Sequence, residues 1–406
     1  MVIHIWKNKQ EVGMLMKRIA LVGLNNFNNM GDQIIAETMQ YLVQKNRVDK
    51  VETYFVDINP YDSYCKVQLP IRFKIFNLIR KLEYFAEKVI HSNKGLYYIQ
   101  YISWKIKLYR YYKKQLENAD AVIFSGGAFI KYRTQELNYL VDMITKISMD
   151  KGIPVMMSAM GVEGYSPTDL RCQKLKTALN RPCVKIITTR DNLSLLNEKY
   201  IVNKSIITAL VGDPAFYIPE YYQKKKKQSD IIGVGIIRSD IFLKYGINYT
   251  EDNVMNLYKE IIKELEKRKI NWKLFSNGFT SDYQFGVQLL ESLKVDKGKY
   301  MPRPKSTHEF IEMISNFDAI IGARLHACIT AYSLDIPSIG LVWNEKLELF
   351  GELIGKKENF INVNQFDAKH IVETLQKNRN DYYDIKQRNV LKGLTEEYIE
   401  RFITML

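Results

Sequence analysis

The chain has 406 residues, of which 46% are apolar and 26% are charged, and its mean hydropathy is −0.24. This length suffices for two domains, and charged residues interrupt every apolar stretch well before the ~18–20 residues that a membrane-spanning helix needs. The 59 Lys and Arg residues outnumber the 45 Asp and Glu residues, which gives a net charge of +14 and a pI near 9.2. Such an excess favours an anionic partner: nucleic acid, a membrane surface or an anionic substrate.

The beginning of the chain and its cysteines indicate a cytoplasmic protein. Residues 1–17 contain several charged side chains and no uninterrupted apolar core, so they do not resemble a secretory signal. The four cysteines are scattered without CxxC or Cys/His clusters, which favours reduced thiols and argues against structural zinc. No DxD-like pair stands in a suitable loop, so we expect no metal cofactor.

The first regular element is an apolar strand at 18–23, followed by an Asn-rich turn and a helix expected over 32–45. The same order of strand, loop and helix recurs, with further buried strands predicted at 121–125, 155–159 and 185–189. This alternation predicts a parallel sheet with helices on both faces. In such sheets ligands bind beyond the carboxyl ends of the strands.

A Pro residue and a run of lysines interrupt the pattern at 219–230, which is the predicted linker. The alternation then restarts, and its expected elements are strands at 231–237, 272–276, 319–321 and 338–342 and helices at 253–267, 307–316 and 327–334. The sequence therefore predicts an α/β protein with an N-terminal domain over 1–218 and a C-terminal domain over 231–406. Two such domains are expected to face each other across a cleft.

The segment 71–115 departs from the alternating pattern. It holds eleven basic residues against two acidic ones, which is +9 of the net +14. Apolar and aromatic residues recur in it near helical spacing, so we expect two amphipathic helices separated at 92–95. The insert is either a docking site for an anionic membrane or a lipid-linked substrate, or a helical hairpin with a solvated basic face.

The segment 317–332 is the strongest candidate for chemistry. A buried strand ends at Gly322, and Arg324, Leu325 and His326 lie where the next helix begins. A helix N-terminus attracts anions, Arg is a bidentate donor for carboxylate or phosphate, and His can transfer a proton near neutral pH. We therefore expect a phosphorylated, carboxylated or nucleotide-linked ligand here, and the alternative is that Arg324 and His326 only close a turn.

Four residues of the first half are further candidates. Asp32 follows Asn29 where a loop enters a helix, and it is interpreted either as a catalytic base or as the helix N-cap. Gly126 and Gly127 follow a strand, and they either let a ligand approach the backbone or form a simple turn.

Other polar residues near strand ends have competing interpretations. Tyr132 and Arg133 would contact a sugar or belong to an exposed loop. Arg190 and Asp191 are expected to pair with each other, or Asp191 to cap its helix. Asp213 is interpreted as a turn residue before the linker.

Taken in order, these motifs resemble the polysaccharide pyruvyl transferase family. The resemblance covers about 17–355 outside the insert, and it rests on the segments 29–32, 126–127, 189–194, 213–215, 324–326 and 335–346. Members of that family transfer pyruvate from phosphoenolpyruvate to two hydroxyls of a sugar and form a cyclic ketal. Their fold is similar to the GT-B fold of glycosyltransferases, with two Rossmann-like domains around a cleft, and phosphoenolpyruvate is a co-substrate rather than a cofactor.

The resemblance implies that Arg324 and His326 are the residues associated with activity. In our hypothesis, Arg324 binds an anionic group of the donor. His326 contacts the phosphate or delivers a proton, and Asp32 acts as the base. Further donor contacts are expected from Leu325, Arg238 and Lys346 in the C-terminal domain, and acceptor contacts from Asn29, Gly126, Gly127, Tyr132 and Arg133 in the N-terminal domain.

The acceptor and the alternatives stay open at this point. The expected acceptor is a sugar of a cell-surface polysaccharide or its polyprenyl-diphosphate-linked precursor, with peripheral contact through 71–115 to the inner face of the membrane and no nucleic acid. The glycine loop Gly126-Gly127-Ala128 lacks a further glycine frequent in relatives, and the insert is unusually aromatic, so the acceptor is not identified. The alternatives are a GT-B glycosyltransferase that uses a nucleotide-sugar, and a non-enzymatic peripheral protein that binds sugar or lipid.

Overall fold

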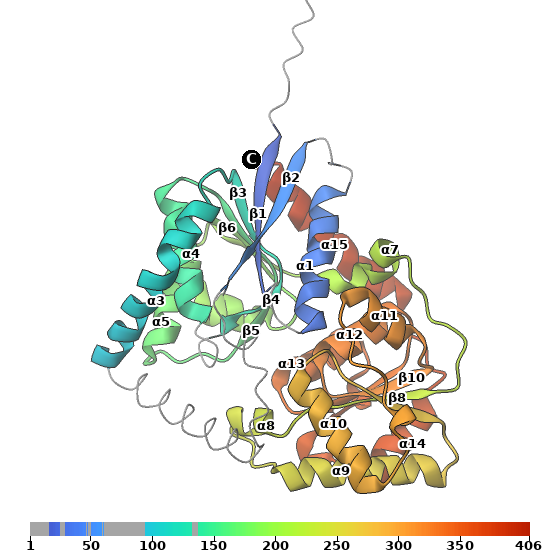
Figure 1. Cartoon of the computed structure of the whole chain (residues 1–406). Helices are drawn as coiled ribbons and strands as arrows, with labels where there is room; N and C mark the ends of the chain where they lie inside the picture. Colours follow the sequence, from blue (N-terminus) through green and yellow to red (C-terminus); the bar gives the residue numbers. More distant parts are fainter. Residues whose placement is uncertain are drawn as a thin grey trace, which may run out of the picture.

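The computed structural model describes residues 16–24, 29–45, 47, 50–58, 60, 94–131 and 137–406 of the chain. Two parallel sheets, each flanked by helices, lie in two halves of the molecule (Figure 1). The α/β class with two parallel sheets is therefore confirmed. Within the described part of the chain, no helix combines the length and the apolar character needed to cross a bilayer.

The first half contains a 7-stranded sheet in the order β2-β1-β3-β5-β6-β7, with β4 paired to β5. Its strands are β1 (Lys17–Gly23), β2 (Val51–Asp57), β3 (Ala121–Phe124), β4 (Gly127–Lys131), β5 (Val155–Glu163), β6 (Val184–Thr189) and β7 (Ile207–Leu210). Its helices are α1 (Met30–Gln44), α3 (Lys94–Gln115), α4 (Leu137–Asp150), α5 (Leu170–Leu179) and α6 (Leu193–Leu195).

Alternate residues of β1 enter two separate cores, as expected for a strand covered on both faces. Ala20 and Val22 pack with α3, α4 and α5, whereas Ile19 and Leu21 pack with α1 and the end of the chain. The helical prediction for the insert is confirmed from Lys94 to Gln115, and the rest of the insert lies outside the described residues.

The second half contains a 5-stranded parallel sheet in the order β12-β11-β10-β8-β9. Its strands are β8 (Ile232–Gly235), β9 (Trp272–Phe275), β10 (Ala319–Gly322), β11 (Ser338–Val342) and β12 (Phe360–Asn362). Its helices are α8 (Asp240–Lys244), α9 (Glu251–Lys267), α10 (Thr280–Leu293), α11 (Thr307–Ser315), α12 (Leu325–Ser333), α13 (Glu345–Leu353), α14 (Ala368–Asn378) and α15 (Ile385–Ile403).

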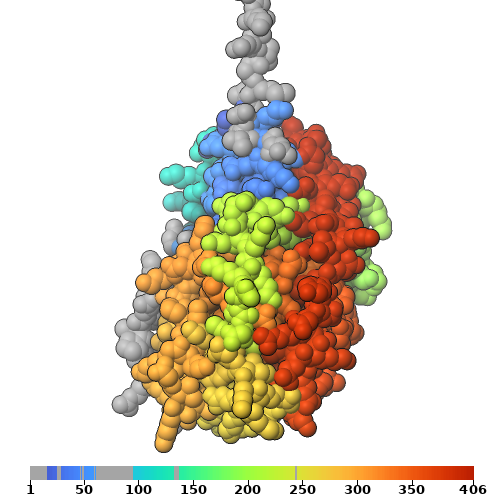
Figure 2. Space-filling view, turned by 90° about the vertical axis from the view of Figure 1, so that its right-hand side faces the viewer, coloured from blue at the N-terminus to red at the C-terminus, as the bar shows by residue number. Residues whose placement is uncertain are grey.

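The segment that leads from the first half to the second begins with η3 (Pro214–Tyr217) and α7 (Ile218–Tyr222). Phe216 and Ile218 are buried in the core of the second half, together with Met30 and Ile34 of α1. The helix α1 therefore packs against both halves. In Figure 2 the chain after α7 (yellow-green) runs along one face of the molecule from the first half to the second.

The C-terminal helix α15 returns to the first half. Its beginning contacts the second half, where Arg388 donates to the Tyr332 carbonyl at 2.7 Å. Its end packs Ile399 and Phe402 against the first sheet. Figure 2 shows the C-terminal residues (red) alongside both halves, an arrangement that the predicted division into 1–218 and 231–406 does not include.

Candidate active site

The loops after β5, β6 and β7 of the first sheet meet the beginnings of α12 and α13 of the second half. A small pocket lies between them, and its lining includes Arg190, Asp191, Asp213, Leu325, Ile329 and Lys346. Both helices follow a buried strand of the second sheet, so their N-termini lie at the carboxyl edge of that sheet. The cleft between the halves is therefore formed by the edges at which α/β sheets bind ligands.

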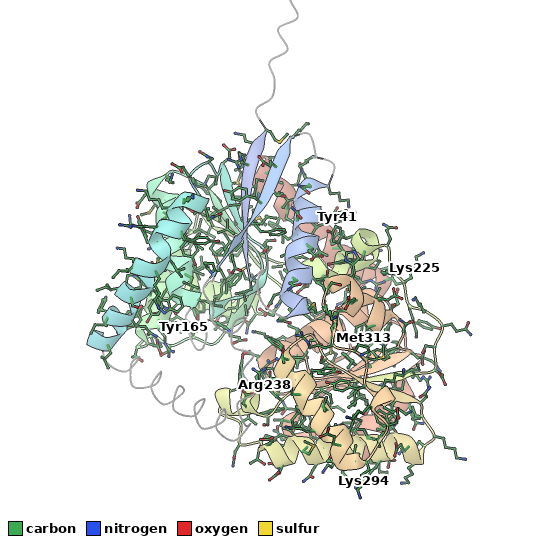
Figure 3. The ribbon with its side chains drawn as sticks, viewed as in Figure 1. Tyr41, Tyr165, Lys225, Arg238, Lys294 and Met313 are labelled. Carbon is green, nitrogen blue, oxygen red and sulfur yellow. The ribbon has the colours of Figure 1, made fainter. Side chains whose placement is uncertain are left out.

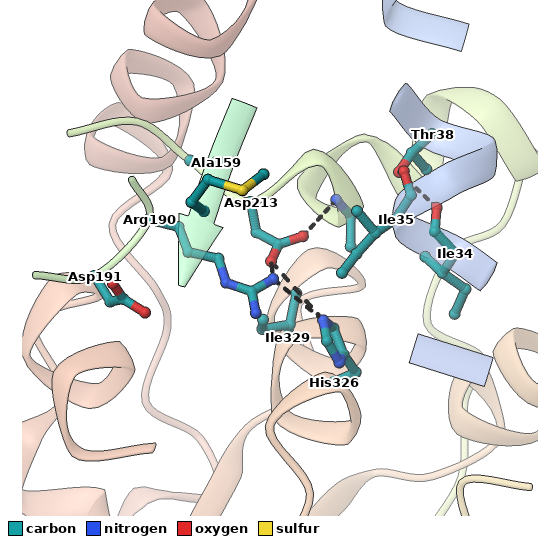
Figure 4. Close-up of polar contacts among 12 residues, drawn as sticks. Ile34, Ile35, Thr38, Ala159, Arg190, Asp191, Asp213, His326 and Ile329 are labelled. Carbon is teal, nitrogen blue, oxygen red and sulfur yellow. Dashed lines mark hydrogen bonds and ion pairs between the residues drawn. The ribbon is translucent and has the colours of Figure 1, made fainter. Parts of the chain in front are cut away.

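His326 is a polar residue of α12 that faces the first half. Its Nε2 lies 3.3 Å from Nη1 of Arg190 and 3.9 Å from Oδ2 of Asp213 (Figure 4). Arg190 is itself paired with Asp213, and both side chains are almost fully buried. Because a guanidinium only donates hydrogen bonds, Nε2 is the acceptor and the ring proton of His326 lies on Nδ1.

The surroundings of His326 keep its imidazole neutral. Burial, together with the positive charges of Arg190 and Lys346, lowers the pKa of His326 to about 3, although Asp213 acts in the opposite direction. At neutral pH and without a bound anion, the ring is therefore uncharged and has no imidazolium proton to donate.

Gly31 at the beginning of α1 packs directly on the His326 ring. A Cβ placed on Gly31 would lie 2.4 Å from Cγ and Nδ1 of that ring, so only glycine permits this approach. A second contact joins the halves beside it, because the backbone N–H of Met30 donates to the Asn277 carbonyl at 3.2 Å. The position of His326 therefore depends on how the two halves meet.

Asp32 lies in the first turn of α1, and it is not the N-cap. Asn29 is the cap, since its side chain accepts from the Gly31 N–H, and its amide also donates to Asp32 at 2.7 Å. The cap interpretation of Asp32 is therefore wrong. Burial raises the pKa of Asp32 above its ordinary value, although the hydrogen bond from Asn29 and the charge of Arg190 act to lower it.

Lys346 in the first turn of α13 reaches across the cleft and pairs with Glu163 at the end of β5. Burial alone would lower the pKa of Lys346, but the Glu163 carboxylate and Tyr245 together outweigh burial, and the pKa is raised. The pKa of Glu163 is lowered, because the nearby cations outweigh the opposite effect of burial. The Tyr245 hydroxyl lies 3.4 Å from the same carboxylate.

Arg324 belongs to a second network, which lies within the second half. Its Nε and Nη2 donate to both carboxylate oxygens of Asp282, a fully buried residue of α10, at 2.6–2.9 Å. Arg238 also approaches Asp282, with Nη1 3.6 Å from Oδ1, at the end of this half that faces the first sheet (Figure 3). Both guanidinium groups also lie over the ring of Phe279.

The structure places the predicted residues in three groups. His326, Leu325, Lys346, Asp32 and Asn29 surround the cleft between the halves, whereas Arg324 and Arg238 surround Asp282. Gly126 and Gly127 adopt φ near +90° after β3, and a Cβ on Gly126 would lie 2.5 Å from Ile35, so both turn geometry and packing require glycine there. Tyr132 and Arg133 lie outside the described residues.

Sequence patterns missed two charged residues of the site, Glu163 and Asp282, and assigned Arg190 and Asp213 to structural roles only. The predicted pair of Arg190 and Asp191 is replaced by the pair of Arg190 and Asp213. Asp191 does not cap its helix, because Asn192 does. Oδ1 of Asp191 accepts from three groups, whereas its Oδ2 is buried without a partner in the described structure. The useful signal was that Glu163, Arg190 and Asp282 follow predicted buried strands, whereas Asp213 follows β7, which was not predicted.

Among the described residues, no group of three or more His, Cys, Asp or Glu side chains could hold a metal ion. Cys172, Cys183 and Cys328 are buried and carry no disulfide.

The same two-sheet fold occurs in solved structures of sugar-nucleotide enzymes. A UDP-GlcNAc 2-epimerase of Methanocaldococcus jannaschii, in complex with UDP-GlcNAc and UDP, matches with a TM-score of 0.54 and 14% identity over 97% of this chain and 100% of that chain. A putative UDP-N-acetylglucosamine 2-epimerase of Listeria monocytogenes matches with a TM-score of 0.56 and 11% identity, and MnaA of S. aureus with UDP matches with 0.55 and 12%, each over 96% of both chains. These likenesses define the class of fold, which is GT-B-like α/β.

The sequence defines the family within that class. The chain belongs to the polysaccharide pyruvyl transferase family, whose sequence model matches residues 29–345. This range includes Asp32, Arg190, Asp213, Arg324 and His326. No curated protein sequence matches the chain.

Proposed function

We propose that this protein transfers the pyruvyl group of phosphoenolpyruvate to two hydroxyls of a sugar, and so forms a cyclic ketal on a cell-surface polysaccharide or its lipid-linked precursor. Membership of the family supports the reaction type. The observation that carries the proposal is the convergence of Arg190, His326 and Lys346, from both halves, on the N-termini of α12 and α13.

The donor requires cations for two anionic groups, a phosphate and a carboxylate. Arg190 and Lys346 supply two positive charges beside the pocket, and the N-terminus of α12 supplies backbone N–H groups, since its cap Arg324 makes no side-chain cap bond. Both cations are paired with carboxylates, Asp213 and Glu163, so donor binding requires the anion to share or replace these partners.

In this proposal Arg324 contributes to the donor site mainly by holding the beginning of α12 in place. Asp282 engages its Nε and Nη2, so Nη1 is the group through which it would reach a donor anion. The same carboxylate orients the Arg238 backbone, whose N–H donates to Asp282 at 3.2 Å. In this proposal Arg324 and Arg238 hold the beginning of α12 in place and extend the positive edge of the pocket.

The ketal forms through proton transfers that balance within the site. In this proposal Asp32, whose pKa is raised by burial, acts in its protonated form and gives its proton to C3 of phosphoenolpyruvate, and the first sugar hydroxyl bonds to C2 and returns a proton to Asp32. The bound dianionic phosphate raises the pKa of His326, which protonates the leaving phosphate as the C2–O bond breaks. The second hydroxyl then bonds to C2 and gives its proton to His326. One hydroxyl proton ends on the new methyl group and the other on phosphate.

The acceptor side is the first half of the molecule. Asn29 orients the Asp32 carboxyl, and the turn at Gly126 and Gly127 lies against Ile35 of the same helix. In this proposal the acceptor hydroxyls approach Asp32 from the side of the turn at Gly126 and Gly127, and Tyr132 and Arg133 stay predicted acceptor contacts.

Thermal unfolding with separate ligands tests the donor. Phosphoenolpyruvate at about 100 times its dissociation constant adds roughly 2.7 kcal/mol to the free energy of unfolding. We expect a rise in the unfolding midpoint beyond that caused by inorganic phosphate, which Lys346→Met abolishes and Lys263→Met on the exposed face of α9 does not. A rise with UDP and none with phosphoenolpyruvate would instead identify a nucleotide-sugar enzyme.

A further inference from the structure

Helix α3 exposes an unusual amount of apolar surface. It lies outside α4 at the outer edge of the first half (Figure 1). Elsewhere in the described chain, exposed large apolar residues are scattered one or two to an element. On this single helix five are exposed, with exposed fractions between 39% and 75%: Leu96, Tyr98, Ile99, Ile102 and Ile106.

The exposed isoleucines form one stripe, because Ile99, Ile102 and Ile106 are spaced by three and four residues. The opposite face fixes the rotation of the helix. Tyr97, Leu108 and Tyr112 on that face are buried, and the Tyr101 hydroxyl donates to Asp142 of α4 at 2.7 Å. The helix therefore cannot turn its isoleucines inward without giving up a packed aromatic face.

The same exposed surface is basic. Five exposed cations lie on α3, and the helix contains no acidic residue: Lys105, Lys107, Arg110, Lys113 and Lys114. No carboxylate among the described residues forms an ion pair with any of them, and the two contacts found lie within the helix, of Lys105 with Tyr109 and of Lys107 with Trp104. Arg110 and Lys113 continue the face of Ile99 and Ile106 at helical spacing.

We propose that α3 is a membrane-docking helix, which lies flat on an anionic bilayer with Ile99, Ile102 and Ile106 in the interface and its cations among the headgroups. A second copy of this chain is not the occupant that the charges favour, because two such faces would place ten cations together with no acidic partner. The inference depends on this surface alone and not on the donor proposed above.

The beginning of the docking helix lies at the same edge of the first half as the cleft. The α3 helix leads directly into β3, whose carboxyl end points toward the second half, so the first turns of α3 lie at that end of the sheet. The Tyr97 hydroxyl confirms the placement, since it lies 3.4 Å from the carbonyl of Leu170, just beyond the end of β5. The docking helix therefore begins at the edge of the first half that also carries the loops of the cleft.

Vesicle co-sedimentation of the full chain tests the proposal. The probes are vesicles of phosphatidylcholine alone and of phosphatidylcholine with phosphatidylglycerol. We expect binding to the anionic vesicles only, weakened by salt. The double variant Ile102→Ser/Ile106→Ser should lower it at least tenfold, and Lys113→Gln/Lys114→Gln should lower it by about fivefold for each residue. The controls Val390→Ser on α15 and Lys263→Gln on α9, which alter exposed side chains elsewhere, should leave binding unchanged.

Three outcomes would overturn the proposal. The first is equal binding to both kinds of vesicle, and the second is full binding by both α3 variants. The third is a change from dimer to monomer in the isoleucine variant, measured by light scattering. That change would identify α3 as a surface for self-association. The isoleucine variant should keep the unfolding midpoint of the native chain and its rise with phosphoenolpyruvate. This readout separates a failure of docking from a failure of the donor assignment.

Discussion

Arg324 and His326 stand two residues apart at the beginning of α12, yet their side chains join different networks. Arg324 turns into the second half, where its Nε and Nη2 donate three hydrogen bonds to the two carboxylate oxygens of the buried Asp282. His326 turns toward the first half and meets Arg190 and Gly31. The first network is complete within one half, whereas the second exists only when both halves are in place. Arg324 therefore supports the fold of the second half, and His326 depends on closure of the cleft.

The largest expected effect is a loss of activity without a comparable loss of stability, at His326. His326→Ala removes the proton-transferring group, and we expect the rate of phosphate release from phosphoenolpyruvate and acceptor to fall about 10³-fold. The free energy of unfolding should change far less, because Arg190 keeps its partner Asp213. His370→Ala, at an exposed position of α14, is the control and should retain the full rate. A full rate in His326→Ala would contradict its catalytic role.

The opposite pattern is expected at Asp282. Asp282→Asn leaves Arg324 and Arg238 without their shared carboxylate, and breaking a buried ion pair in this way should lower the free energy of unfolding by about 3 kcal/mol. Urea unfolding measures this loss. Glu373→Gln, which breaks an exposed pair with Arg268, should leave the unfolding midpoint unchanged. If Asp282→Asn were as stable as the native chain, the network of Arg324 and Asp282 would not stabilise the second half.

A substitution at Gly31 tests whether the position of His326 depends on the contact between the two halves. In Gly31→Ala the new Cβ would meet the His326 ring at 2.4 Å, so the ring or the whole first half must shift. A displacement of this size should lower the turnover rate about 10²-fold while the chain stays folded. Gly393→Ala is the matched control, since no atom lies within 4 Å of the added group. Equal turnover in the two variants would show that the contact between the halves does not position the ring.

The pH dependence of stability is the smallest of these effects. The folded pKa of His326 is about 3, below the ordinary value of 6.5, so the unfolded chain binds more protons between these values. The contribution of His326 is therefore complete above pH 6.5 and is lost as the pH falls through 6.5 toward about 3. Between pH 7 and pH 5 the loss should be about 2 kcal/mol. His326→Asn should remove this part of the slope in unfolding measurements, and an unchanged slope would mean that the folded ring titrates normally.

The sequence was sufficient for the framework of the fold. Apolar runs predicted the strands at the centre of both sheets, and the change from strand to helix placed Arg324 and His326 at the beginning of α12. The edge strands β2, β7 and β12 were not predicted, because they are short or only partly buried and lack a continuous apolar run.

The partners within the site could not be predicted in the same way. Arg190 was expected to pair with the adjacent Asp191, but residues that follow each other at the end of a strand point in opposite directions. Arg190 instead meets Asp213, which lies 23 residues later, after the next strand. Asp282 precedes Arg324 by 42 residues and lies on another helix, so no local pattern joins the two. Such pairs depend on how strands and helices pack, which spacing along the chain does not specify.

The path of α15 limits how the cleft can open. The chain crosses between the halves twice, once after α7 and again along α15, whose two ends contact different halves. We expect two such connections to favour a rotation of the halves about the line that joins them over a sliding motion. Thr395 lies near this axis, where its hydroxyl donates to the Gly212 carbonyl at 3.0 Å. The cleft, on the far side of α1, would then be the part of the molecule that moves most during such a swing.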